Sequence, residues 1–263
     1  MQHKLISLLA LFAATSASAE PLFIDRAADL QLSHQYTGEW EHFVGGGVAS
    51  FDCNGDLMAE LYIAGGASPA TLLRNTTLSR GAQISLIPDT PASLALTGVT
   101  GAYPLDIDSD GTLDLFIMRV GENQLLKGGP DCTFTKFDDL DFDGGDRWTT
   151  AFSATWEGDN TLPTLAIGNY VDRDDTQGPF AACDDNILMR PSNGRYDVTL
   201  LEPGYCPLSM LFSDWGRNGR QDLRVSHDRH HYAGGATAQL WAMEATPRPY
   251  PAHGRRTPCI PSA

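Results

Sequence analysis

One short pattern recurs along the middle of the chain and restricts its fold more than any other feature. It consists of an apolar strand, an acidic turn rich in asparagine and glycine, and a second apolar strand. The clearest copy reads DIDSDGTLD at residues 106–114 and is followed by the apolar run LFIM. Further copies lie at 52–60 and 214–222, and a copy that has lost most of its acids lies around 157–160. A pattern repeated in this way predicts an array of similar β-units.

The spacing of the copies indicates how large each unit is. Strands are expected before the turns at 48–51, 102–105, 151–154 and 209–213, and again further on at 71–75, 124–128, 187–191 and 239–243. A period of roughly 50 residues suits a four-stranded blade of a β-propeller. No amphipathic pattern long enough for a helix of about 12 residues appears after the N-terminus. The sequence therefore predicts an all-β fold with about four blades.

The same segments carry a resemblance to a known family. They are FVGGG at 43–47 leading into DCNGD at 52–56, GNYVD at 168–172, and the run from SDW at 213–215 to HD at 227–228. These units resemble FG-GAP/VCBS repeats, the blades of integrin-α-type β-propellers, and are most similar to the cartilage acidic protein-like family. The resemblance covers residues 21–243. It implies a secreted, non-catalytic protein that acts in interaction or adhesion through loops on the propeller faces.

The family usually has seven blades, so about four blades leave the ring incomplete. The resemblance also implies that residues 23–25 pair with the last blade. After Met243 the composition changes to a segment rich in proline and arginine, so residues 244–263 are expected to form a disordered tail. The blade count and this change together favour a truncated chain. Uncovered apolar faces near 48–51 and 240–243 predict self-association.

The acidic turns have the chemistry of a calcium site. Ca²⁺ prefers six to eight oxygen ligands, and Asp106, Asp108, Asp110 and Asp114 offer four carboxylates at alternating positions of one turn. If Gly111 turns the chain sharply, the main-chain carbonyl of Thr112 adds a fifth ligand. Four crowded carboxylates repel one another without a cation, which favours metal binding over a merely solvated turn.

A weaker calcium site is predicted in the first turn, from Asp52, Asn54, Asp56 and Glu60. Leu57 replaces the glycine there, and a left-handed leucine costs about 1–2 kcal/mol. The turn at 214–222 has Gly216 in place of an acid, and the Glu157 copy has lost the pattern. Both are expected to be structural turns. The alternative for every copy is that the acids only solvate a turn.

The N-terminus has the features of an export signal. A short polar stretch precedes an apolar run at 5–14, and Ala17-Ser18-Ala19 predicts cleavage after Ala19. Residues 1–19 are therefore interpreted as a signal peptide, residues 20–243 as the propeller, and the protein as secreted or periplasmic. The chain has 18 basic and 33 acidic residues and a net charge of −15, so nucleic acids and anionic membranes are poor partners. The apolar run is too short to span a bilayer.

Export permits disulfides, and the sequence contains five cysteines. Cys183 and Cys206 bracket a predicted hairpin of strands at 187–190 and 196–200, which makes them the favoured pair. Cys53 with Cys132 is a weaker pair, and Cys259 is expected to be free.

Three functions remain open from the sequence. The first is calcium-dependent binding of an extracellular protein or glycan, without catalysis. The second is a propeller-based hydrolase or carbohydrate-active enzyme that uses the loop His227–His231 with Asp228 for acid–base chemistry. The third is a truncated product without function.

Overall fold

The computed structural model describes residues 22–30, 32–138, 140–176, 178, 182–228 and 238–251. The chain divides into two units, Met1–Gln31 and Leu32–Ala263. In the described part of the first unit, residues 22–30, the one regular element is the 3₁₀ turn η1 (Ala27–Asp29). The strand that the family resemblance implied at residues 23–25 is therefore not formed. The expected signal peptide, residues 1–19, lies outside the described residues.

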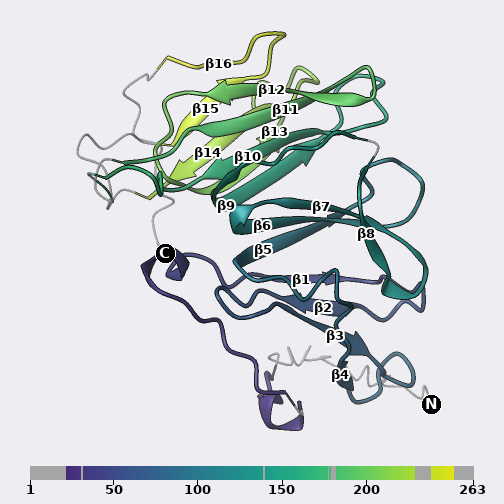
Figure 1. Cartoon of the computed structure of the whole chain (residues 1–263). Helices are drawn as coiled ribbons and strands as arrows, with labels where there is room; N and C mark the ends of the chain where they lie inside the picture. The colour runs from purple at the N-terminus through teal and green to yellow at the C-terminus, as the bar shows by residue number, and fades with distance from the viewer. Residues whose placement is uncertain are drawn as a thin grey trace, which may run out of the picture. The chain divides into compact units, whose positions relative to one another are not determined.

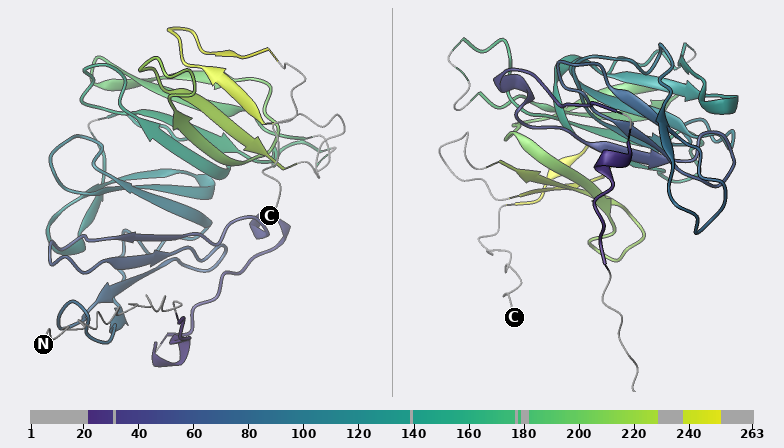
Figure 2. Two further views of the ribbon diagram at one scale, coloured as in Figure 1. Left: turned by 180° about the vertical axis from the view of Figure 1, so that it is seen from behind. Right: turned by 90° about the horizontal axis from the view of Figure 1, so that it is seen from below.

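The second unit is built from antiparallel strands that follow one another in chain order (Figure 1), and the views from behind and from below show the same succession (Figure 2). The first meander comprises β1 (Val48–Phe51), β2 (Glu60–Ile63), β3 (Thr71–Asn75) and β4 (Leu86–Pro88). The second comprises β5 (Val99–Leu105), β6 (Asp114–Glu122), β7 (Gln124–Gly128) and β8 (Phe134–Lys136). The third comprises β9 (Asp146–Thr155), β10 (Thr164–Asn169), β11 (Asn186–Ser192) and β12 (Arg195–Leu201). The fourth comprises β13 (Pro207–Ser213), β14 (Asp222–His227), β15 (Gln239–Ala242) and β16 (Arg248–Pro249).

The predicted all-β class is thus confirmed. The ends of β6 and β9 also pair, Val120–Glu122 against Asp146–Trp148, which joins the second and third meanders into one eight-stranded sheet. The strands expected at 48–51, 71–75 and 124–128 coincide with β1, β3 and β7, and the other predicted strands overlap their elements. In the described part of the chain the helices are three short 3₁₀ turns, and none has the length and apolar character that crossing a bilayer requires.

In each meander the turn between the first and second strands is closed at the same position. The turns are closed by the register pairs Phe51↔Glu60, Leu105↔Asp114, Thr155↔Thr164 and Ser213↔Asp222. Each turn therefore spans eight residues, at 52–59, 106–113, 156–163 and 214–221. In the third turn this register places Trp156, rather than Glu157, at the first position.

Three cores lie between successive meanders, because alternate residues of a strand point to opposite faces of a sheet. Leu115 and Ile117 of β6 join the core shared with the first meander, whereas Phe116 and Met118 join the core shared with the third. A third core contains residues of the third and fourth meanders, including Ala166 of β10. Burial of each large side chain contributes about 1.5–3 kcal/mol, so these cores hold the successive sheets face to face.

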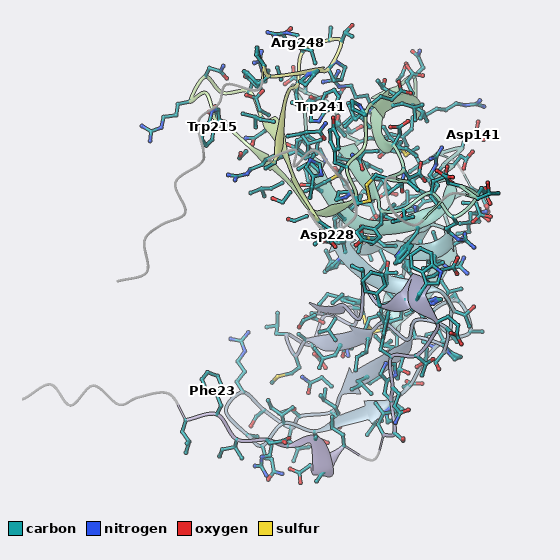
Figure 3. All side chains as sticks on the ribbon, turned by 90° about the vertical axis from the view of Figure 1, so that its left-hand side faces the viewer. Phe23, Asp141, Trp215, Asp228, Trp241 and Arg248 are labelled. Atoms are coloured by element: carbon teal, nitrogen blue, oxygen red, sulfur yellow. A yellow bond between two sulfur atoms is a disulfide. The ribbon has the colours of Figure 1, made fainter. Side chains whose placement is uncertain are left out.

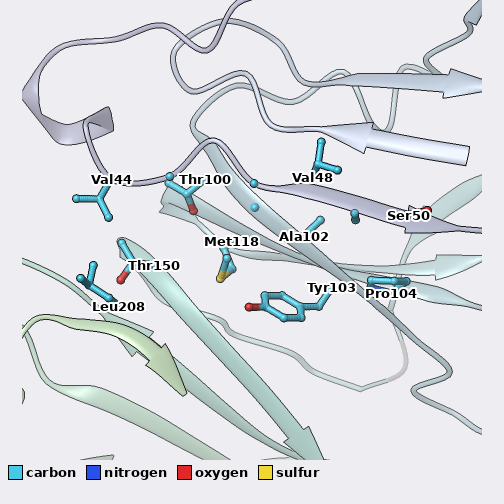
Figure 4. A pocket seen from close by; sticks show the side chains of 14 residues that line it. Val44, Val48, Ser50, Thr100, Ala102, Tyr103, Pro104, Met118, Thr150 and Leu208 are labelled. Atoms are coloured by element: carbon cyan, nitrogen blue, oxygen red, sulfur yellow. The ribbon is translucent and has the colours of Figure 1, made fainter. Parts of the chain in front are cut away.

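The first strands of the four meanders, β1, β5, β9 and β13, all contribute residues to the lining of one hollow of about 510 Å³ (Figure 4). Hydrogen bonds link neighbouring first strands: Gly47 N–H donates to Thr100 O (3.1 Å), Thr100 Oγ1 to Thr149 O (2.7 Å), and Thr150 Oγ1 to Pro207 O (2.6 Å). A Cβ at position 47 would lie 3.2 Å from the Cα of Gly101, so glycine permits this close approach.

The last sheet differs from expectation at both its face and its end. Trp241 is buried in the third core. On the outer face of β14, Arg224 and Ser226 occupy the positions that Phe116 and Met118 occupy in β6, and both are half-exposed. The apolar face expected near residues 240–243 is therefore partly polar. The tail expected from residue 244 onward is ordered as far as residue 251, because β16 pairs with β15 and Tyr250 Oη donates to Asp222 Oδ2 (2.8 Å). Residues 252–263, including Cys259, lie outside the described residues.

Two disulfides cross-link the second unit. Cys183 is joined to Cys206 with Cα atoms 4.9 Å apart, as the predicted hairpin of β11 and β12 indicated. Cys53, in the first turn, is joined to Cys132 with Cα atoms 4.8 Å apart, which confirms the weaker pairing and ties the first meander to the second. Two disulfides in one chain indicate an oxidising compartment.

Candidate metal centre

The second acidic turn, residues 106–113, is held by its own side chains. Asp106 accepts the backbone N–H groups of Asp110 (3.0 Å) and Gly111 (2.9 Å), and Asp110 accepts that of Thr112 (2.8 Å). Gly111 has φ of 87°, a left-handed conformation that glycine adopts without strain. The sharp turn that the sequence predicted at Gly111 is present.

Asp114 closes this turn from inside the protein, where it is 0% exposed. Its two carboxylate oxygens accept the N–H groups of Ile107 (2.8 Å) and Gly128 (2.8 Å). Burial raises the pKa of Asp114 to about 6, opposed by these two donors and assisted by the charges of Asp108 and Asp110. The carboxylate links the turn to the end of β7 and remains largely ionised at neutral pH.

Three of the predicted ligands converge. Asp106, Asp108 and Asp114 each place a carboxylate oxygen so that all three lie within 4.8 Å of one another. Oxygens that each lie about 2.3–2.6 Å from one Ca²⁺ are separated by at most about 5 Å, so this set fits the ion. Asp108 Oδ1 is buried and has no hydrogen-bond partner among the described residues. An acceptor left in this way is available to a cation.

Lys127 of β7 also contacts the cluster. Its Nζ forms an ion pair with Asp108 and lies 3.1 Å from Asp110 Oδ2. The backbone N–H of Thr112, and then Lys127, lower the pKa of Asp110, while the two carboxylates raise the pKa of Lys127. The sequence did not indicate this residue, because it lies on another strand.

The first turn, residues 52–59, has a similar backbone but a different cluster. Asp52 accepts the N–H groups of Gly55 (2.8 Å) and Leu57 (2.7 Å), and Leu57 has φ of 67°, the left-handed conformation expected there. Glu60 is turned inward and accepts the N–H groups of Cys53 (3.1 Å) and Asn75 (3.3 Å).

Two of the oxygen ligands predicted in the first turn, Asn54 and Asp56, are hydrogen-bonded to each other. Asp56 N–H donates to Asn54 Oδ1 (3.0 Å), and Asn54 Nδ2 donates to Asp56 Oδ2 (3.1 Å). Among the described residues, Asp52, Asp56 and Glu60 do not form a group of converging carboxylates. Glu60 does lie near Cys53 and Cys132, but their sulfurs form a disulfide and offer no thiolate to a metal.

The third and fourth turns are also held by side-chain hydrogen bonds, from fewer acids. In the third, the guanidinium of Arg190 pairs with both oxygens of Glu157 (2.9 and 3.0 Å). In the fourth, Asp214 accepts the N–H groups of Asn218 (2.9 Å) and Gly219 (3.0 Å), as Asp106 does in the second turn. In both turns side-chain hydrogen bonds hold the backbone, and the assignment of the two turns as purely structural stays a prediction.

The other candidate site, around His227 and Asp228, lies at the opposite end of the sheet from the acidic turns. Figure 3 shows Asp228 and Trp215, a residue of the fourth turn, at opposite ends of the last sheet. Asp228 Oδ2 accepts a hydrogen bond from Tyr170 Oη (2.6 Å), and burial lowers the pKa of His227 to about 4. His227 is thus neutral at physiological pH. Residues 229–231 of the predicted loop lie outside the described residues.

The same end of the sheets carries aromatic residues that the sequence analysis did not propose as a site. Trp40, 44% exposed, lies in η2 (Trp40–His42) and contacts the buried Trp148 at 5.1 Å between ring centroids. Trp148 in turn contacts Tyr170 at 4.9 Å. An adjacent hollow of about 750 Å³ is lined mainly by acidic residues together with Arg147 and Arg173. Arg173 joins the two features, because it pairs with Asp146 of the hollow (3.1 Å) and with Glu41 of η2 (3.3 Å).

Comparison with known proteins identifies no family for the chain. No protein-family description matches the chain, and no curated protein matches it. One similar solved structure is the crystal structure of BBS1N in complex with ARL6DN, soaked with lead, at 11% sequence identity and a TM-score of 0.41. The match covers 75% of this chain and 54% of that chain, so it spans about half the length of the solved structure. The class that the structure itself defines is an all-β protein of consecutive antiparallel sheets with two disulfides.

Proposed function

We propose that the protein is an exported, calcium-stabilised β-propeller-like protein of FG-GAP/VCBS repeats that binds an extracellular protein or glycan and has no catalytic activity. The observation that carries the calcium assignment is the convergence of Asp106, Asp108 and Asp114 within a turn that is built four times in the same register. Asp110 and the carbonyl of Thr112 complete the proposed ligand set. The first turn, with Asp52, Asn54, Asp56 and Glu60, is a weaker second site.

Two features support a propeller-like arrangement. The three cores join the meanders in chain order, as the blades of a propeller are packed. The first strands, which are the innermost strands of propeller blades, line one hollow (Figure 4). Secretion or a periplasmic location is supported by the disulfides and by the predicted signal peptide.

The end of the sheets opposite the acidic turns is the proposed ligand-binding surface. An exposed tryptophan provides apolar area at a small loss of conformational freedom, and an adjacent charged hollow can orient a polar ligand. Self-association through the outer faces of the first and last sheets is a second proposed interaction. Loss of glycan-array binding in the variant Trp40→Ala, with unchanged far-UV circular dichroism, would support the surface. Retained binding would exclude it.

The calcium assignment is tested by thermal unfolding in EDTA and in increasing CaCl₂. An ion that binds only the folded state stabilises it by about 2.7 kcal/mol at a hundredfold excess over its Kd. We expect calcium to raise the Tm of the wild type and to have little effect on the double variant Asp108→Ala, Asp110→Ala. The double variant Asp197→Ala, Glu202→Ala, which removes two exposed acids away from the turn, is the charge control. An equal calcium response in the double variant and the control would refute the site.

A further inference from the structure

Lys127 already supplies a positive charge to the proposed calcium site. Its ammonium contacts Asp108 and lies 3.1 Å from Asp110, the two carboxylates at the third and fifth positions of the turn. These are also the two carboxylates that the backbone of the turn depends on least, since Asp106 and Asp114 accept most of the N–H groups. One ammonium beside four carboxylates leaves an excess of negative charge.

The strand position of Lys127 can be compared across the four meanders. The register pairs Leu61↔Leu73, Leu115↔Leu126, Leu165↔Met189 and Leu223↔Trp241 make the next residues equivalent. These residues are Arg74, Lys127, Arg190 and Ala242. Arg74 pairs with Asp131, away from its own turn, whereas Arg190 pairs with Glu157 through two hydrogen bonds. This position thus holds an arginine paired mainly with Asp131 in the first meander and a lysine paired with the turn in the second. It holds an arginine paired with the turn in the third meander and an alanine in the fourth.

We propose that Lys127 is an internal competitor of the metal ion. Its ammonium neutralises Asp108 and Asp110 while the turn holds no calcium, and calcium binding displaces it into solvent. The proposal rests on the calcium site described above. It assigns Lys127 the role of setting the calcium concentration at which that site fills.

Lysine suits such an exchange and arginine does not. The ammonium is a point charge on a flexible stem, whereas a guanidinium holds a carboxylate through a rigid planar fork. The Lys127 side chain is 40% exposed and its Nζ lies 5.6 Å from the centre of the Phe137 ring, so it can turn toward water without opening the core. Calcium needs the same carboxylate oxygens that the ammonium occupies, and two cations in one cluster repel each other. Simultaneous binding is therefore disfavoured.

The experiment measures the calcium affinity and the metal-free stability of the complete chain for wild type, Lys127→Met and Lys127→Arg. Isothermal titration with CaCl₂ gives Kd, and thermal unfolding in EDTA gives the Tm without metal. Lys136→Met is the matched control, since it removes the same charge from the neighbouring strand β8, where Lys136 lies 3.9 Å from Glu122.

We expect Lys127→Met to bind calcium about fivefold more tightly, about 1 kcal/mol, because a competing, partly exposed ion pair has been removed. In EDTA its Tm should be about 2–4 °C lower. Lys127→Arg should bind calcium more weakly than wild type, and Lys136→Met should match wild type in both measurements.

Equal affinities for wild type and Lys127→Met would overturn the competition while leaving the calcium site intact. If Lys127→Met does not fold, Lys127→Arg decides, and an affinity equal to or above that of wild type refutes the proposal. If wild type and both variants fail to bind calcium at millimolar concentration, the calcium site itself is wrong and the inference is withdrawn with it.

Discussion

The buried carboxylate of Asp114 provides a strict test of how the acidic turns are built. Its two oxygens accept the N–H groups of Ile107 and Gly128, both at 2.8 Å, at a site that is 0% exposed. The variants Asp114→Asn and Asp114→Ala remove the same negative charge, so the free energy of burying that charge cancels between them. Asparagine keeps one acceptor oxygen, so it pairs one N–H group while its NH₂ faces the other, whereas alanine leaves both buried N–H groups without a partner.

A buried donor without a partner costs about 1–3 kcal/mol. Asp114→Ala should therefore be less stable than Asp114→Asn by about 1–3 kcal/mol. Urea unfolding at pH 7 in EDTA measures this difference without any contribution from a metal. With a slope of about 2–3 kcal/mol per molar urea, the two midpoints should differ by about 0.3–1.5 M. Coincident midpoints would show that the acceptor is not needed, and would contradict the structural role assigned to this residue.

Three further outcomes follow from the same geometry. The pKa of Asp114 is raised from 3.8 to about 6, so its carboxyl group loses its proton at a higher pH in the folded state than in the unfolded state. Its contribution to the free energy of unfolding therefore falls as the pH rises from about 4 to about 6. Because calcium needs the carboxylate, its effect on Tm should be larger at pH 7 than at pH 5, and an equal effect would count against Asp114 as a ligand. The variant Cys183→Ser, Cys206→Ser should lose about 2–4 kcal/mol in chemical unfolding. Reduction of the wild type should cost more, because it also opens the longer loop closed by Cys53 and Cys132. Leu57→Gly should raise stability by about 0.5–1 kcal/mol in urea unfolding, since relief of the left-handed leucine exceeds the added flexibility of glycine; a destabilised variant would contradict that conformation.

Sequence reasoning identified those parts of the fold that are encoded locally. The strands β1, β3 and β7 were predicted at their observed bounds, because each is a short apolar run that recurs at the same place in the repeated unit. The fourth strands β4, β8 and β16 were missed. They are two or three residues long and are largely exposed, so they show too little alternation of apolar and polar residues to be detected.

Features that depend on register between strands were also missed. Lys127 reaches Asp108 only because β6 and β7 pair with Leu115 opposite Leu126, and the spacing of acids within one turn carries no information about that pairing. The partly polar outer face of the last sheet is a similar case. Arg224 is recognisable as an outward residue only after the strands have been aligned meander by meander.

Comparison of the four turns distinguishes the acids that hold the backbone of the turn from the acids that need a cation to offset their charge. The first and last acids of the pattern have a backbone role, since Asp214 and Asp222 accept N–H groups in a turn that has lost its other carboxylates. Gly216 and Asn218 stand at the third and fifth positions of that turn, and the hydrogen bonds of its backbone are retained. Carboxylates at those two positions, Asp108 and Asp110 in the second turn, are therefore not needed for the turn to form. Because these two additional carboxylates repel each other and their neighbours, their presence implies a cation that offsets their charge. That cation is Lys127, a calcium ion, or first one and then the other.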